Sequence, residues 1–277
     1  MDLQHIASQV RRDIVRMVHA VQSGHPGGSL GCADFLTALY FKIMKLEPKP
    51  FNMDGVGEDL FFLSNGHISP LLYSVLAHRG YFNVAELASF RKLNSRLQGH
   101  PTTHEGLPGI RIASGSLGQG MSVACGAALS KRANADDNFV FSLHGDGELQ
   151  EGQNWEAILF AAHYKLDNYI ATIDVNGQQI DGSTNKVMHM GSLKAKFVAF
   201  EWNVLEVDGH NMDALVATLE AAKALKGSQK PTVILMTTTM GKGVNFMEGT
   251  HEWHGIAPNN DQLVDALAQL PETIGDY

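Results

Sequence analysis

The sequence contains no run of basic residues, and this absence limits its range of partners. Its 21 lysines and arginines are outnumbered by 29 aspartates and glutamates, which gives a formal net charge of −8. Phosphate backbones require clustered lysine and arginine, so neither nucleic acid nor an anionic membrane surface is an expected partner. No window approaches ~18 uninterrupted apolar residues, the length that a membrane-spanning helix needs. A basic pocket for one small anion remains compatible with this composition.

Cysteine is equally scarce. Cys32 and Cys125 stand far apart in apolar or small-residue surroundings, and neither belongs to a Cys-x-x-Cys pair or has metal-ligand spacing. We therefore expect two buried free thiols and no disulfide scaffold, as in a cytoplasmic protein. Residues 1–20 have the pattern of an amphipathic helix that carries three arginines. They lack the continuous apolar stretch and the small-residue cleavage site of a signal peptide.

No internal repeat, low-complexity tract or flexible linker divides the 277 residues. With 44% hydrophobic residues and 28 glycines the composition is that of a globular protein, and we expect a single domain over residues 1–277. Short apolar runs alternate with segments of helical period. The predicted strands are 60–64, 138–143, 169–175, 204–207 and 232–239, and the predicted helices that accompany them are 70–79, 121–132, 154–164 and 212–225.

Continuous apolar strands that alternate with amphipathic helices are typical of a parallel sheet covered on both faces. The sequence thus predicts an α/β fold, with a doubly wound, mostly parallel sheet and helices on both faces. Right-handed crossovers place the carboxyl ends of such strands along one edge of the sheet. The glycine-rich and polar turns follow the strands, so they should gather at that edge, where open α/β sheets bind ligands.

The segment from Gly145 to Gly177 carries the strongest chemical signal. Asp146 follows one predicted strand, and Asn176 follows the next strand thirty positions later. One strand–helix–strand unit brings these ends together, and carboxylate and amide oxygens suit a hard cation such as Mg²⁺. Glycines on both sides of Asp146 let backbone amides approach a phosphate. A tight turn with Asp146 as a helix cap is the alternative, but the paired spacing favours the metal site.

A second glycine cluster covers residues 115–120 (Gly-Ser-Leu-Gly-Gln-Gly) and precedes a predicted helix of small residues. Glycine there permits positive φ and close packing, and the start of the helix favours a bound anion. The simpler interpretation is a turn that only packs a helix against the sheet.

Four histidines stand beside glycine or proline in predicted loops. A lone loop histidine is usually solvated or caps a helix, but four in such settings indicate a rigid cluster that faces a ligand. Their imidazoles could donate to a diphosphate or transfer protons near neutral pH. These residues are His25, His67, His100 and His254.

The motifs together resemble those of transketolases, in the same order and at similar spacing from residue 23 to residue 255. The Gly-Asp-Gly with a downstream Asn is typical of thiamine-diphosphate enzymes, and the histidine set narrows the resemblance to transketolase-like members. The matching segments are 23–27 (Ser-Gly-His-Pro-Gly), 63–67 (Leu-Ser-Asn-Gly-His), 99–101 (Gly-His-Pro), 115–120, 145–148 (Gly-Asp-Gly-Glu), 176–177 (Asn-Gly), 180–182 (Ile-Asp-Gly) and 254–255 (His-Gly).

The resemblance implies thiamine diphosphate and Mg²⁺ as cofactors and the transfer of a two-carbon ketol unit from a ketose phosphate to an aldose phosphate. The implied metal ligands are Asp146, Asn176 and the backbone carbonyl of Gln178, with the ion bridging the two phosphates. The resemblance also implies that Gly147 and His67 contact the diphosphate, and that Gly115, Ser116 and Leu117 line the cofactor cleft. It implies proton transfer by His25 and His254, of which His254 also lies beside the cofactor. His100 is implied to contact the sugar hydroxyls.

The sequence departs from the family pattern in two ways. Gln178 stands where many relatives have an apolar residue, a change that a backbone ligand tolerates. The chain stops at Tyr277, and the family's pyrimidine-binding domain, which carries the glutamate that activates the cofactor, has no counterpart in it. The resemblance therefore implies the N-terminal subunit of a two-chain transketolase, inactive alone and completed by a C-terminal subunit in a heterotetramer.

Two other interpretations stay open. One is a thiamine-dependent ketol transfer on an unusual sugar phosphate (sulfonated, branched or deoxy), because the residues that recognise the acceptor's phosphate in the family lie mostly in the absent chain. The other is a regulatory subunit that keeps the fold alone, which the intact candidate ligands Asp146 and Asn176 and the intact histidines disfavour.

Overall fold

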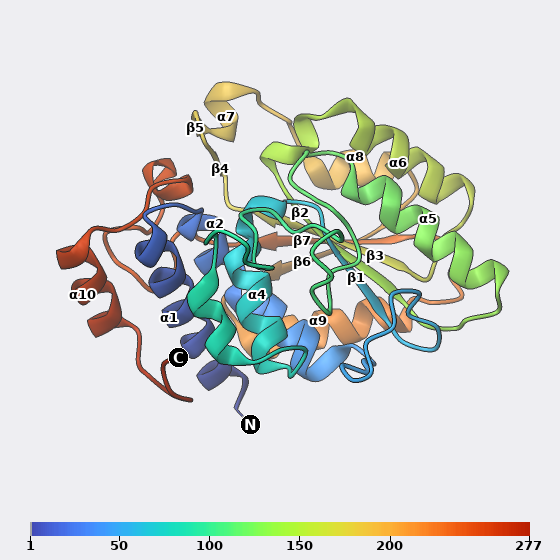
Figure 1. The fold of residues 1–277 in the computed structure, drawn as a ribbon. Coiled ribbons are helices and arrows are strands. Elements are labelled where there is room, and N and C mark those ends of the chain that lie inside the picture. The colour runs from blue at the N-terminus through green and yellow to red at the C-terminus, as the bar shows by residue number, and fades with distance from the viewer. Residues whose placement is uncertain (1) are drawn as a thin grey trace.

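A five-stranded parallel sheet forms the centre of the computed structural model, which describes residues 2–277 (Figure 1). The strand order is β1-β2-β3-β7-β6. The strands are β1 (Leu60–Leu63), β2 (Val140–Gly145), β3 (Tyr169–Val175), β6 (Asn203–Asp208) and β7 (Thr232–Thr237). Every strand predicted from the sequence is present, within two residues of its predicted ends.

Helices connect and cover these strands. The longer ones are α1 (Leu3–Val21), α4 (Ser69–His78), α5 (Gly120–Ala133), α6 (Gly152–His163), α9 (Met212–Ala224) and α10 (Asn260–Gln269), and the shorter ones are α2 (Pro26–Gly31), α3 (Ala33–Ala38), α7 (Thr184–Val187) and α8 (Leu193–Ala199). A short π-helix, η1 (Leu39–Ile43), continues α3. The 3-10 helices are η2 (Gly66–Ile68), η3 (Val84–Ser89), η4 (Gly147–Gln150) and η5 (His251–His254). A two-residue hairpin joins β4 (Gln178–Gln179) to β5 (Gly182–Ser183).

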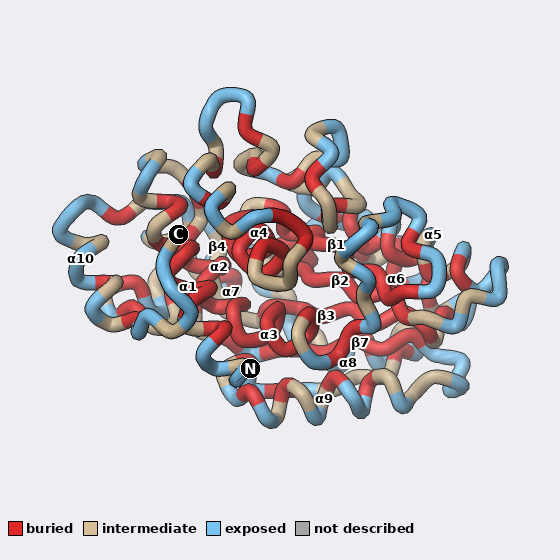
Figure 2. Tube along the Cα trace, turned by 60° about the horizontal axis from the view of Figure 1, so that its bottom comes forward, coloured by how far each residue is buried: buried red, intermediate tan, exposed pale blue. Residues whose placement is uncertain are grey.

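Side chains that alternate along the strands build two apolar cores. Phe61 and Leu63 of β1 belong to the core beneath α1, α3, α4 and α9, whereas Leu60 and Phe62 belong to the core beneath α5 and α6. This division follows from the two-residue period of a strand. Figure 1 shows α5, α6 and α8 on one side of the sheet and α1, α4 and α9 on the other, and Figure 2 shows the sheet buried between them. The predicted α/β fold with helices on both faces is confirmed.

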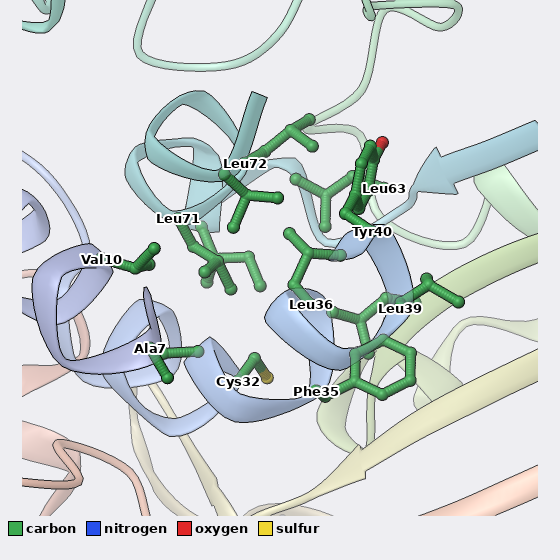
Figure 3. Close-up of a cluster of buried hydrophobic side chains, with 14 of the residues drawn as sticks. Ala7, Val10, Cys32, Phe35, Leu36, Leu39, Tyr40, Leu63, Leu71 and Leu72 are labelled. Atoms are coloured by element: carbon green, nitrogen blue, oxygen red, sulfur yellow. The ribbon is translucent and has the colours of Figure 1, made fainter. Parts of the chain in front are cut away.

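The region between α1 and β1 differs from the expectation, because the helices α2 and α3 there have no counterpart among the predicted elements. Residues 26–40 are buried on all sides, so they lack the apolar and polar faces that reveal a surface helix. Figure 3 shows side chains of α3 packed between α1 and α4, with Cys32 among them. Both cysteines are buried free thiols, as predicted.

The arginines of α1 are structural. Arg11 donates two hydrogen bonds to the Asp34 carboxylate (2.9 and 2.6 Å), which ties α1 to α3. Arg12 makes a similar pair with Asp276 (2.9 and 2.7 Å) and ties the last residues of the chain to the same helix. The helix predicted over residues 1–20 is present as α1. Met1, the first residue of that prediction, lies outside the described residues. Among residues 2–277 no helix has the length and apolar character that a membrane crossing requires.

Candidate functional site

The candidate site lies at the carboxyl ends of β2 and β3. These neighbouring strands are parallel, and Gly145 is the register partner of Asp174. Asp146 follows β2, and its backbone N–H donates to the Asp174 carbonyl (3.1 Å). Asn176 follows β3, and both Asp146 and Asn176 line one pocket. The structure thus brings Asp146 and Asn176 together across thirty positions of sequence, as their places after neighbouring strands predict.

Backbone amides orient the polar groups of this pocket. The Asp146 carboxylate accepts from the N–H of Gly147 and from that of Gly177, both at 2.8 Å. Asn176 Oδ1 accepts from the N–H of Gln178 (2.8 Å), and its Nδ2 donates to Asp174 Oδ2 (2.7 Å). Burial, and then the charge of Asp174, raise the pKa of Asp146 to about 7. A cation beside Asp146 would offset both effects, because it favours the ionised carboxylate.

The donor chemistry here fits Mg²⁺. Within the described chain no group of three or more His, Cys, Asp or Glu residues could hold a metal. The candidate ligand set relies instead on the Asp146 carboxylate, the Asn176 amide oxygen and the Gln178 carbonyl, and all three residues line the pocket. Oxygen ligands from one or two carboxylates, completed by phosphate and water, are what Mg²⁺ usually takes in proteins.

The four glycine-framed histidines form one cluster at the same edge of the sheet. The ring centroid of His25 lies 5.2 Å from that of His67, 5.6 Å from that of His254 and 6.2 Å from that of His100. The His67 and His254 rings are 5.0 Å apart. His67 and His254 line the pocket that holds Asp146, whereas His25 and His100 lie beside them and do not line it.

Several polar atoms around the pocket are buried and unpartnered. Nδ1 of His25, Nδ1 of His254 and Oδ1 of Asn65 make no hydrogen bond within residues 2–277. Buried polar atoms normally have partners, so each such group calls for an explanation. A polar ligand in the pocket that His254, His67 and Asn65 line would supply partners there.

Burial favours the neutral form of all four histidines. Burial lowers the pKa of His67, His100 and His254. Burial, with the neighbouring His254, Arg91 and His100, lowers the pKa of His25 to about 4. Neutral imidazoles can both accept and donate a proton, which suits them to proton transfer.

These shifts predict how stability depends on pH. An unfolded histidine titrates near pH 6.5 and folded His25 near pH 4, so between these values the unfolded chain binds more protons. The stabilising contribution of neutral His25 should be complete above about pH 6.5 and lost as the pH falls to about 4. Thermal unfolding of the cofactor-free chain should show this decline, and His25→Gln should show a shallower one. The exposed His189, changed to Gln, is the matched control, and equal slopes for wild type and His25→Gln would contradict the assignment.

Glycine is required where the site loops touch. A Cβ on Gly115, at φ +129°, would lie 2.7 Å from the His100 ring, and one on Gly66 would lie 2.7 Å from the backbone of Ser114. The loop at 115–120 is therefore packed directly against the histidine loops. Of its predicted cleft residues, Leu117 lines the pocket, whereas Gly115 and Ser116 do not. Ser116 Oγ instead accepts a hydrogen bond from Gln119 (3.1 Å).

Other residues of the pocket were not identified from the sequence. Asp174 lies inside an apolar strand, where no pattern indicated a site. It is nevertheless buried and accepts hydrogen bonds from Asn176 and from Thr238 Oγ1. Met240 and Ile180 line the pocket as apolar walls. Glu148 closes the Gly-Asp-Gly-Glu motif, and its buried carboxylate accepts from Gly118 N–H (2.9 Å) and Gly145 N–H (3.1 Å).

Comparison with known proteins places this geometry in a family. The family described as "Transketolase, thiamine diphosphate binding domain" matches residues 3–271. The chain is 39% identical over 270 residues to the 6-deoxy-6-sulfo-D-fructose transketolase subunit SqwG of Clostridium sp. (strain MSTE9), covering 98% of this chain and 96% of that protein. It is 37% identical to an apulose-4-phosphate transketolase subunit of Phocaeicola vulgatus, covering 95% and 92% of the two chains.

Solved structures agree with this assignment. Transketolase from Leishmania mexicana superposes with a TM-score of 0.90 at 32% identity, covering all of this chain and 43% of that one. The chain therefore spans less than half the length of that transketolase. With a family match over nearly its whole length and relatives of similar length, this chain belongs to the transketolase family and forms its thiamine-diphosphate-binding domain.

Proposed function

We propose that this chain is the catalytic N-terminal subunit of a transketolase that moves a two-carbon ketol unit from a ketose phosphate to an aldose phosphate. The observation that carries the proposal is one pocket lined by a metal-suited pair, Asp146 and Asn176, and by two histidines, His67 and His254. The whole of residues 1–277 then serves as one diphosphate-binding domain of a cytoplasmic enzyme.

The cofactor would be held by the polar side of this pocket. Asp146, Asn176 and the Gln178 carbonyl would bind Mg²⁺, and Gly147 and His67 would contact the diphosphate. Gly115, Ser116 and Leu117 would line the cofactor cleft, with Leu117 in the pocket itself and Gly115 and Ser116 beside it in the same loop. When bound, thiamine diphosphate supplies the electron sink for the carbon–carbon bond chemistry, while the protein supplies orientation and electrostatics.

The histidines would handle protons and hydroxyl groups. His254 and His25 have a Nδ1 that is buried without a partner in the described chain, and both have a lowered pKa. A neutral imidazole in this position can take a proton from a sugar hydroxyl and return it. His100, which is more exposed, would hold sugar hydroxyls at the entrance.

A second chain would complete the site. Two relatives that match this chain over nearly their whole length are named as transketolase subunits, which supports a C-terminal partner with the pyrimidine-binding domain. That partner would contribute the glutamate that activates the cofactor. Two copies of each chain in a heterotetramer fit the closed symmetry of most oligomers.

Two classes of sugar are candidates for the substrate of this reaction. Ordinary pentose-phosphate substrates are one, and an unusual sugar is the other, favoured by relatives named for 6-deoxy-6-sulfo-D-fructose and apulose 4-phosphate. A purely regulatory role is disfavoured, because Asp146, Asn176 and the four histidines are all retained around the site.

Co-expression tests the proposal. The chain would be produced with the candidate partner encoded beside it, and the complex assayed for ketol transfer from xylulose 5-phosphate, 6-deoxy-6-sulfofructose and apulose 4-phosphate. We expect transfer from one donor class, lost when either chain, thiamine diphosphate or Mg²⁺ is omitted. A complex that binds no cofactor and transfers from none of the donors would contradict the enzymatic role. Sedimentation of the complex tests the heterotetramer, which a one-to-one particle would rule out.

A further inference from the structure

Glu148 joins three loops of the candidate site through one buried carboxylate. Its side chain enters from η4, directly after the Gly-Asp-Gly turn, and the residue is 3% exposed. Oε1 accepts from Ser64 Oγ, at the end of β1, and from the N–H of Gly118 (2.9 Å), in the glycine cluster. Oε2 accepts from the N–H of Gly145 (3.1 Å), at the end of β2.

These donors belong to segments far apart in the sequence. Ser64 immediately precedes the loop with Asn65 and His67, and its hydroxyl also accepts from the N–H of Gly120 (3.2 Å). Gly118 follows Leu117, which lines the pocket, and Gly145 immediately precedes Asp146. One carboxylate therefore fixes the spacing between three walls of the pocket: the loop with Asn65 and His67, the glycine cluster at 115–120, and the turn that carries Asp146.

A buried polar chain supports Glu148 from behind. His144 Nδ1 lies 3.8 Å from Glu148 Oε1, and His144 Nε2 pairs with Ser142 Oγ (2.7 Å). Ser142 Oγ in turn pairs with the hydroxyl of Tyr169 (2.7 Å). These residues are fully buried on β2 and β3 and pack behind the carboxylate, although His144 Nδ1 makes no hydrogen bond within the described chain. The backbone carbonyl of Glu148 is also fixed, because it accepts from Asn154 Nδ2 (2.7 Å).

We propose that Glu148 is a positioning residue that sets the width of the cofactor cleft by holding its three walls together. The proposal rests on the proposed function, since it assumes that the pocket takes thiamine diphosphate. Glu148 acts here through the backbone of Gly118 and Gly145 and needs no contact with the reacting atoms.

The arrangement requires a carboxylate. The donors approach both oxygens, so an amide in this place would turn its NH₂ group toward either Gly145 N–H or the Ser64 and Gly118 donors. A buried donor without an acceptor is destabilising, so the loop that carries it becomes looser. Glu148→Gln thus removes part of the hydrogen bonding that connects the three loops, while the volume of the side chain stays nearly unchanged.

The test combines amide exchange with cofactor affinity. In the full cofactor-free chain, Glu148→Gln should accelerate hydrogen exchange at the amides of Gly118 and Gly145 by about tenfold or more. In the assembled complex, the apparent Kd for thiamine diphosphate at fixed Mg²⁺ should rise about tenfold, while kcat at saturating cofactor stays within about twofold. The split between affinity and turnover separates positioning from general damage.

Glu58→Gln is the matched control. Glu58 is a glutamate of similar burial (4% exposed) that pairs with Arg111 and accepts from the N–H of Glu47 (3.0 Å), before β1. Its replacement should lower the unfolding temperature without changing exchange at Gly118 or the cofactor Kd. If Glu148→Gln does not fold, Ser64→Ala removes one donor of the same tie and should act in the same direction with a smaller effect.

Three outcomes would overturn the proposal. These are unchanged exchange at Gly118 and Gly145, an unchanged cofactor Kd in a complex whose wild type binds cofactor, or a loss of kcat alone. If the wild-type complex binds no thiamine diphosphate, the proposed function fails. The exchange data then still decide whether Glu148 holds the loops, but the proposal that it sets the width of a thiamine-diphosphate cleft is refuted.

Discussion

Replacing Asp146 by alanine should abolish Mg²⁺-dependent retention of thiamine diphosphate in the assembled enzyme. Asp146 is the single carboxylate in the candidate ligand set, and it is buried (6% exposed) with its oxygens fixed by the amides of Gly147 and Gly177. Without it, Mg²⁺ would lose its only predicted carboxylate ligand, and the negative charge of the diphosphate would be left uncompensated. Removing one member of a buried charge pair costs ~3–5 kcal/mol, which corresponds to a roughly 10²–10⁴-fold loss of affinity.

Calorimetric titration of the cofactor, with and without Mg²⁺, checks this expectation. The wild-type complex should bind much more tightly with Mg²⁺, and Asp146→Ala should bind weakly in both conditions. Asp34→Asn is the control, because it alters a buried carboxylate that pairs with Arg11 and does not line the pocket. Unchanged affinity for Asp146→Ala would refute the metal assignment.

Replacing His254 by alanine should lower turnover by ~10²–10⁴-fold, the range that a positioned general acid or base supplies. His254 lines the same pocket as Asp146, its ring lies next to those of His67 and His25, and its pKa is lowered by burial. Its Nδ1, which has no partner within the described chain, is available to exchange a proton with a ligand. The loss should fall on kcat, because the candidate metal ligands stay in place.

Steady-state kinetics of the complex at saturating cofactor would measure this effect. His251→Ala is a close control, since His251 lies in the same short turn, η5, and does not line the pocket. A His254→Ala rate near that of wild type would reduce the residue to a packing role. Equal losses in both variants would point instead to disruption of η5.

The order of residues was enough to predict the sheet and one half of the candidate site. The strands were predictable because buried parallel strands are continuous apolar runs, and Tyr169–Val175 was located to the residue. Asp146 and Asn176 were predictable as neighbours because both follow strands that one right-handed crossover joins. Their proximity depends on local chain geometry, which short stretches of sequence specify.

Contacts across long separations became visible only in the folded chain. The glycine-framed positions of His25, His67, His100 and His254 predicted a cluster, but no spacing rule gives the mutual arrangement of their rings, which come from four separate loops. The same holds for the hydrogen bonds by which the Glu148 carboxylate connects three loops. The helices at 26–38 also escaped prediction, because complete burial removes the amphipathic period. A periodic pattern in a sequence records which face of an element meets water, whereas the packing of distant loops depends on the shape of the whole fold.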